Sequence, residues 1–181
     1  MGASVKWRFA LQFLITFALL VFAWQVGNFA TYYRTAVLAS ARAVSPPING
    51  WWLEYDRPGV PGGIAFRSAN QRLPMLLDLP ALSMGLMPLI SLIVATPGMT
   101  WRRIVVTALI GSALYLLVHV AVVLVYPLIM VNPNPVKDTV GVFSGLVAFV
   151  VAPLGLWFVL TYPVLRTLWQ LAPLERPTRP R

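Results

Sequence analysis

The sequence contains no cysteine, which excludes disulfide bonds, thiolate metal sites and cysteine nucleophiles. It contains a single histidine, His119, so a histidine-rich zinc site cannot be assembled either. A glycine-rich phosphate loop is also missing, because the glycines at Gly59–Gly63 lie among prolines and lack a following helix. Common enzyme templates are therefore excluded, and we expect no catalytic residue, cofactor or metal ion.

Charged side chains are scarce: they make up 10% of the 181 residues, whereas 59% of the residues are hydrophobic. A soluble domain carries roughly 25% charged residues. Four stretches without any charge are long enough to cross a bilayer, since a helix rises about 1.5 Å per residue and the hydrocarbon core is about 30 Å thick. They are Phe9–Tyr33, Leu79–Trp101, Ile104–Val136 and Thr139–Leu165. The sequence therefore predicts an all-α integral membrane protein with four transmembrane helices.

These spans divide the chain into four parts. The parts are a cytoplasmic N-terminus with the first helix (1–33), an extracytoplasmic segment (34–78), a three-helix bundle (79–165) and a basic cytoplasmic tail (166–181). The first span is interpreted as a retained signal anchor, because the apolar region of a cleaved signal has only about 7 to 15 residues. Pro80 and Pro88, with Gly85 between them, interrupt the second span, which predicts a kink there.

Basic residues set the expected orientation, since Lys and Arg collect on the cytoplasmic flanks of membrane helices. If the spans alternate, the larger group of basic residues falls on the side of both termini. This group is Lys6, Arg8, Arg102, Arg103, Arg166, Arg176, Arg179 and Arg181. We therefore expect both termini to lie inside (N-in and C-in). The same flanking residues account for much of the net charge of +9, so no nucleic-acid partner is expected.

The residue pattern changes to a two-residue period between Trp51 and Phe66, with turn residues in the middle. This pattern predicts a small β-hairpin-like segment outside the membrane, between the first two transmembrane helices. A lone hairpin is marginally stable in water, so it must lean on the outer leaflet, the helix bundle or a partner protein. The candidate contact residues are Trp51, Trp52, Glu54, Asp56 and Arg57.

Small residues recur along the last span at intervals of four, three, four and three. They are Gly141, Gly145, Ala148, Ala152 and Gly155. Small side chains let two helix backbones approach closely, which matters in lipid because apolar side chains gain nothing by leaving it. We expect this candidate packing seam to receive either another helix of the same bundle or a helix of a partner subunit.

His119 is the ionisable side chain that lies clearly inside a span, and Tyr115 precedes it by one helical turn. An ionisable group within the membrane is a functional hypothesis by default. Neutral histidine is the least costly such group, however, and Tyr115 could hydrogen-bond to it. Tyr115 and His119 are therefore a candidate intramembrane polar site. The sequence allows two roles for this site: a structural hydrogen bond, or the transfer of a proton or binding of a ligand.

The chain resembles a family of small bacterial membrane proteins, the exosortase H-associated membrane proteins. The resemblance covers most of the chain. It rests on a basic and aromatic start (Lys6–Phe9), one anchor helix, an extracytoplasmic segment with strand character, and three helices, of which the first passes through Leu86–Ile90 into Ala95–Pro97. It implies a place in the bacterial inner membrane beside an exosortase, the transpeptidase that recognises C-terminal sorting signals. The chain would not be that enzyme, which depends on a catalytic cysteine.

Three functional hypotheses follow. The first is a non-catalytic accessory or scaffold subunit of an envelope protein-sorting or surface-assembly system, with the lipid bilayer and another membrane protein or a second copy as partners. The second is a small transporter or channel subunit with His119 in a polar path, for which the other spans supply Gln12, Gln25, Asn28, Ser83 and Ser91. The third, a membrane enzyme using Glu54, Asp56 or Asp78, is the weakest, because a short hairpin offers no evident cleft and no third ligand.

Overall fold

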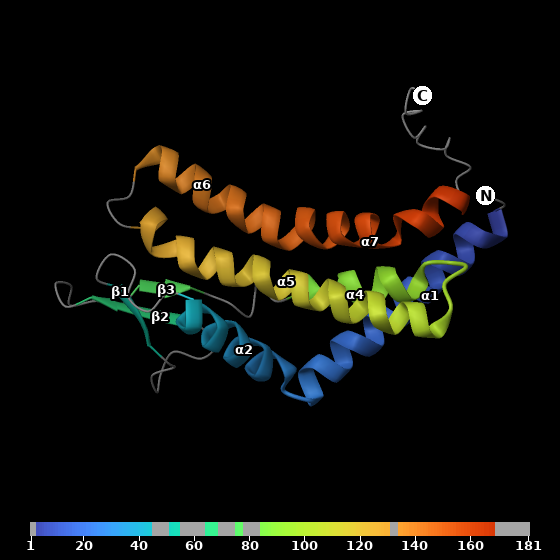
Figure 1. Cartoon of the computed structure of the whole chain (residues 1–181), viewed down its shortest axis with the longest axis horizontal. Coiled ribbons are helices and arrows are strands. Elements are labelled where there is room, and N and C mark those ends of the chain that lie inside the picture. The colour runs from blue at the N-terminus through green and yellow to red at the C-terminus, as the bar shows by residue number, and fades with distance from the viewer. Residues whose placement is uncertain are drawn as a thin grey trace, which may run out of the picture.

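The computed structural model describes residues 3–44, 51–54, 64–68, 75–77, 84–130 and 134–168, and most of them are helical (Figure 1). The helices are α1 (Ala3–Val26), α2 (Phe29–Val44), α4 (Leu86–Ala95), α5 (Trp101–Met130), α6 (Pro135–Leu146) and α7 (Ala152–Leu168). A short π-helix, η1 (Val147–Val151), joins α6 to α7. The strands are β1 (Trp51–Glu54), β2 (Ile64–Ser68) and β3 (Met75–Leu77).

Three helical stretches are long and apolar enough to cross a membrane: Trp7–Val26, Trp101–Ile129 and Pro135–Thr167. They correspond to the first, third and fourth predicted spans, and they indicate a membrane protein. Within the second predicted span, the described helix is α4, which has 10 residues. Such a helix is about 15 Å long, which is roughly half of the hydrocarbon core.

The limits of α4 follow from its flanking residues. The sequence predicts a kink at Pro88. In the structure Pro88 lies in the first turn of α4, where a missing backbone N–H is tolerated. The helix ends before the turn at Pro97–Gly98, where Gly98 has a φ of +80°. A positive φ is readily adopted by glycine and stops a right-handed helix.

An elbow between α1 and α2 interrupts the first predicted span, which the sequence analysis extends to Tyr33. Asn28 has a φ of +52°, and its side chain accepts a 2.8 Å hydrogen bond from the hydroxyl of Thr31. Gly27 has no room for a side chain, because a β-carbon there would collide with the ring of Phe29. The elbow redirects the chain, so that α2 runs along α5 rather than continuing the axis of α1 (Figure 1).

The three strands form an antiparallel sheet in the order β1-β2-β3, with Trp51 opposite Ser68 and Phe66 opposite Met75. The sequence predicts the positions of the first two strands, whereas Met75–Leu77 gives no alternating pattern and was not predicted as a strand. Phe66 is buried, and its ring lies 5.5 Å from the ring of Tyr126 on α5. The described part of the sheet therefore packs on the helix bundle.

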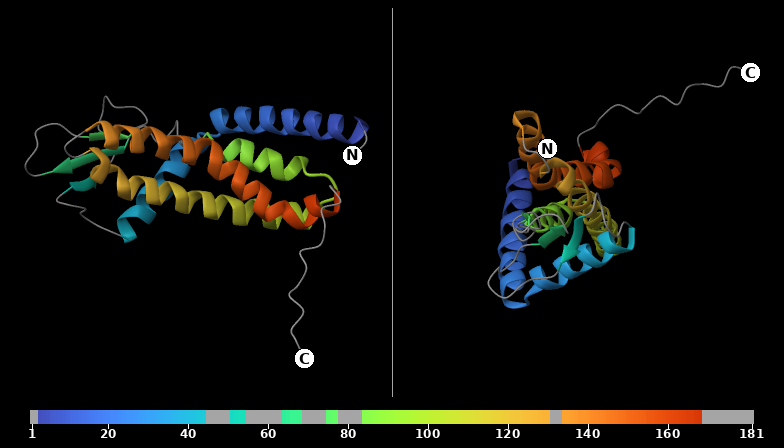
Figure 2. Two further views of the ribbon diagram at one scale, coloured as in Figure 1. Left: turned by 90° about the horizontal axis from the view of Figure 1, so that it is seen from above. Right: turned by 90° about the vertical axis from the view of Figure 1, so that its left-hand side faces the viewer.

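Helix α4 lies at the centre of the bundle, although it is the shortest of the apolar helices. It contacts α1, α5 and α7, which enclose it in the two views of Figure 2. Leu89, Ser91, Ile93 and Ala95 have no exposed surface. The long helices carry many exposed apolar side chains instead, as expected for surfaces that face lipid.

Candidate functional site

A cluster of aromatic and polar side chains joins α2, α5 and η1 inside the bundle. We call Tyr33, Tyr115 and His119 the tyrosine–histidine cluster. The hydroxyl of Tyr33 and Nδ1 of His119 share a 2.5 Å hydrogen bond. The ring of Tyr115 meets the edge of the His119 ring with the centroids 4.4 Å apart, and its hydroxyl donates a 3.0 Å hydrogen bond to the carbonyl of Ala148. The cluster therefore connects three elements that are far apart in the sequence.

Tyr115 and His119 lie together because residues four apart share one face of a helix. Both are fully buried. The sequence predicts their proximity, and His119 also shares a hydrogen bond with Tyr33, which is 86 residues away. Sequence analysis missed Tyr33, although a signal exists: Tyr33, Val37 and Ala41 recur every four residues, and the latter two are buried.

The π-helix explains why Tyr115 finds an acceptor at Ala148. The N–H of Ala152, which would bond to Ala148 in an α-helix, bonds to Val147 instead. The next possible donor in a π-helical pattern is residue 153, which is a proline and has no N–H. The carbonyl of Ala148 is therefore left without a donor from its own helix, and the hydroxyl of Tyr115 supplies one.

Gly85, just before α4, closes the cluster from another side. A β-carbon at this position would collide with the Tyr115 hydroxyl and lie 3.0 Å from Cγ of Pro153. Any side chain at position 85 must therefore displace Tyr115 or the helix that carries Pro153. The geometry indicates a tightly fitted junction.

Further polar side chains inside the bundle also bond to its own elements. Nε1 of Trp157 on α7 donates a 2.9 Å hydrogen bond to Oγ1 of Thr96, which follows α4. The hydroxyl of Ser91 donates to the carbonyl of Met87, and that of Thr161 to the carbonyl of Trp157. Gln25, a candidate for a polar path, is exposed on the outer surface of α1.

The residues of the candidate packing seam have different surroundings. Ala148 is fully buried against α5, whereas a β-carbon at Gly145 or Gly155 would meet no atom within 4 Å. The intervals assume a regular α-helix, and η1 interrupts that period by adding residues to one turn. In contrast, Gly111 on α5 lies in a close helix contact, where a β-carbon would be 3.3 Å from Leu160 and 3.4 Å from Ile93.

Among the described residues, further hollows lie outside this cluster, and three of them are considered below. A groove of about 300 Å³, which we call the lateral groove, runs between α5 and the segment of α6 and η1. It is lined by Val118, Ala121, Val125, Ile129, Ser144 and Val147, among others. A smaller apolar hollow lies beside Trp24, and a third, polar one lies beside Arg8. Tyr115 and His119 line none of these three.

The expected extracytoplasmic contact is described only in part. Trp51, Trp52 and Glu54 belong to β1, whereas Asp56 and Arg57 lie outside the described residues, as does Asp78. Within the described segments, no three His, Asp or Glu side chains form a group that could hold a metal ion.

Comparison with known proteins gives no match to a family model, a curated protein or a solved structure. The resemblance to the exosortase H-associated proteins therefore stays a prediction from the sequence.

Proposed function

We propose that the chain is a non-catalytic accessory subunit that holds another membrane protein in a bacterial envelope protein-sorting system of the exosortase type, or in a surface-assembly system. The observation that carries the proposal is how the intramembrane polar groups are used. Tyr33, Tyr115 and His119 bond to other elements of the same chain, and Tyr115 and His119 have no exposed surface. Such groups hold a scaffold together and leave its outer faces for a partner.

The lateral groove is the surface that we assign to this partner. Its lining is apolar apart from Ser144 and the Tyr126 hydroxyl, and it lies between two helices of membrane length. A transmembrane helix of the sorting enzyme would fit such a groove side by side with α5. Burial of apolar surface alone gives no gain in lipid, so the association would depend on close van der Waals packing at the small residues of the groove, Ala121 and Ser144.

The proposed topology has four spans in the inner membrane with both termini in the cytoplasm. The start of α1, the turn between α4 and α5, and the end of α7 lie at one end of the bundle, with the sheet at the other (Figure 1). The first end carries Arg8, Arg102, Arg103 and Arg166. This distribution supports an inside position for that end, because cytoplasmic flanks are rich in Arg and Lys.

A transporter or channel subunit receives less support. His119 would have to face a polar path, yet it is enclosed by Tyr33 and Tyr115. Ser91, the candidate polar residue of α4, bonds to its own helix. Flux into proteoliposomes that is lost in His119→Ala would favour this alternative.

The test of the scaffold uses two exposed alanines of α5, Ala121 in the lateral groove and Ala113 outside it. In mildly solubilised membranes, the tagged chain should purify with one stoichiometric membrane transpeptidase. Ala121→Trp should release this partner and leave exported proteins with unprocessed C-terminal signals, whereas Ala113→Trp should do neither. A chain that purifies alone, or an equal effect of both substitutions, would contradict the proposal. If the partner is a second copy of the chain, the scaffold proposal is wrong and the chain self-associates instead.

A further inference from the structure

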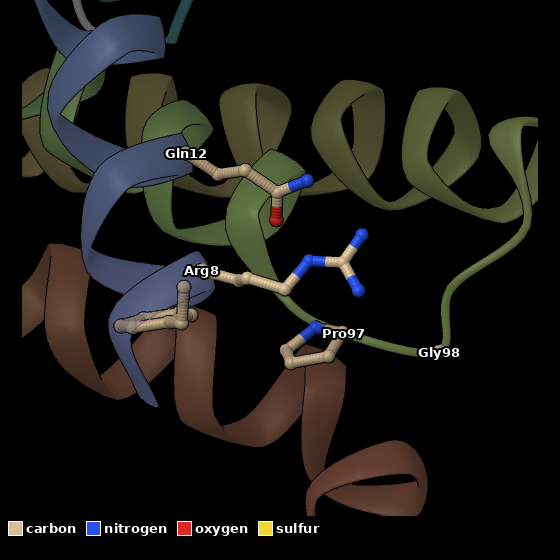
Figure 3. Close-up of a pocket in the computed structure, with 5 residues that line it drawn as sticks. Arg8, Gln12, Pro97 and Gly98 are labelled. Carbon is tan, nitrogen blue, oxygen red and sulfur yellow. The ribbon is translucent and has the colours of Figure 1, made fainter. Parts of the chain in front are cut away.

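The polar hollow beside Arg8 has a defined shape and a single sign of charge. We call it the Arg8 pocket: it has a volume of about 270 Å³ and is lined by Arg8, Phe9, Gln12, Pro97 and Gly98. Arg8 and Gln12 are one turn apart on α1, so they share a face of the helix. Figure 3 shows the Arg8 guanidinium and the Gln12 amide directed into the same space beside the Pro97–Gly98 turn.

The walls of the Arg8 pocket are held by contacts that do not involve Arg8. The ring of Phe9 lies 6.4 Å from that of Trp157, and Trp157 donates its hydrogen bond to Thr96, directly before Pro97. The hydroxyl of Thr96 in turn donates to the carbonyl of Leu92. These contacts connect α1, α4 and α7 around the pocket. A pocket fixed in this way loses little conformational freedom when it binds a ligand.

The surroundings of the Arg8 pocket are positively charged. Arg102, Arg103 and Arg166 lie at the same end of the bundle. Within the described segments, the acidic residues are Glu54 in β1 and Asp138 in α6, and both of these elements are at the opposite end (Figure 1). The described segments therefore supply no carboxylate near Arg8, and the charge of the Arg8 pocket suits an anionic ligand.

The chemistry of the two polar side chains identifies the kind of anion. A guanidinium presents a planar fork of N–H donors that matches two oxygens of a phosphate, and the Gln12 amide adds a further donor. A volume of about 270 Å³ lies just below the usual range for small-molecule pockets, about 300–1,000 Å³, and suits a small headgroup. Trp7 and Trp101 are 70% and 74% exposed near this end, as is typical of aromatic residues at a membrane interface.

We propose that the Arg8 pocket binds the phosphate ester of an anionic ligand, with an anionic phospholipid headgroup as its source. Basic pockets between transmembrane helices on the cytoplasmic side bind such headgroups. The inference uses the membrane position proposed above but needs no protein partner. A failure to bind lipid would therefore not contradict the scaffold proposal, and a failure to bind a protein partner would not contradict lipid binding.

The experiment compares arginines in the full-length chain, reconstituted in phosphatidylcholine nanodiscs. Binding of phosphatidylglycerol is measured by titration and by native mass spectrometry of the released chain. Arg8→Gln should weaken the affinity about ten- to a hundredfold, because a charge-assisted hydrogen bond is lost. Arg103→Gln, which removes the same charge at the same end but outside the pocket, should leave the affinity within about twofold.

Two further variants exclude misfolding as the cause. Gln12→Leu leaves every charge in place, so it should insert normally and still weaken binding severalfold. Arg8→Lys should bind with intermediate affinity, because it keeps the charge and loses the fork. Equal losses in Arg8→Gln and Arg103→Gln would overturn the proposal, since they would indicate diffuse attraction to the membrane surface. So would unchanged binding in both Arg8→Gln and Gln12→Leu.

A separate titration distinguishes the two sources of the phosphate group. Glycerol 3-phosphate is added to the chain in nanodiscs that lack phosphatidylglycerol. We expect no saturable binding below millimolar concentration, which supports the lipid as the source. Tight binding of this soluble ester that depends on Arg8 would overturn the lipid as the source and assign the same site to a soluble phosphate ester.

Discussion

Gly85 and Gly155 look alike in the sequence, since each is a glycine within an uncharged stretch of membrane length. Their surroundings are different. A β-carbon at Gly85 would collide with Tyr115, whereas one at Gly155 would meet no atom within 4 Å. Gly85, directly before α4, is therefore needed for close packing within the bundle. Gly155 on α7 is not, and its part of the surface is open to lipid or to another protein.

The largest effect that we expect from this comparison is on stability. Gly85→Ala should lower the free energy of unfolding by about 3 kcal/mol, because the added methyl group overpacks the junction and moves Tyr115 away from the carbonyl of Ala148. Reversible unfolding in detergent micelles, followed by tryptophan fluorescence, measures this change. The matched control is Gly155→Ala, which makes the same chemical change in open space. Similar losses in both variants would show that the two glycines do not differ in packing.

A smaller loss is expected when only the hydroxyl at the junction is removed. Tyr115→Phe should cost about 2 kcal/mol, because a buried carbonyl is left without a donor. Tyr32→Phe serves as the control, since Tyr32 is 69% exposed. The same unfolding assay applies, and a Tyr115→Phe variant as stable as Tyr32→Phe would contradict the role assigned to this hydroxyl.

The role of η1 can be tested by combining two substitutions. Pro153→Ala restores an N–H that can bond within the helix, so it should make the Tyr115 hydroxyl less necessary. The double variant should then be more stable than the sum of the two single changes predicts, by about 1 kcal/mol. Strict additivity would mean that Pro153 and Tyr115 do not act on the same carbonyl.

The particular residues show what could be predicted from the sequence. The long helices α1, α5 and α6–α7 follow from the absence of charge, and the pairing of Tyr115 with His119 follows from helical spacing. The contact between Tyr33 and His119 could not be predicted, because it depends on the elbow at Asn28, where one residue adopts a left-handed conformation. The π-helix η1 could not be predicted either, because the intervals of the candidate packing seam assume a regular α-helix.

The elbow itself gives a prediction of moderate size. Tyr33→Phe removes the hydroxyl that bonds to His119, and we expect a loss of about 1 kcal/mol, typical of a single hydrogen bond between neutral groups. The aromatic contact between the two rings remains in this variant. Amide hydrogen exchange should show faster opening of α2 relative to wild type, with α7 unchanged. Equal effects on both helices would mean that the bond does not act locally.

The smallest effect on stability is expected at Gly145, where a substitution can affect association with a partner without affecting folding. Gly145→Leu should change the free energy of unfolding of the purified chain by no more than about 0.5 kcal/mol, because a β-carbon at this position meets no atom within 4 Å. Gly111→Leu should destabilise the chain by about 2 kcal/mol, since it forces apart the contacts with Leu160 and Ile93. If a partner helix lies across the surface of α6, Gly145→Leu should reduce its recovery from solubilised membranes while the chain itself stays folded. If the Gly111→Leu variant alone loses the partner, association depends on correct packing of the core and not on the surface around Gly145.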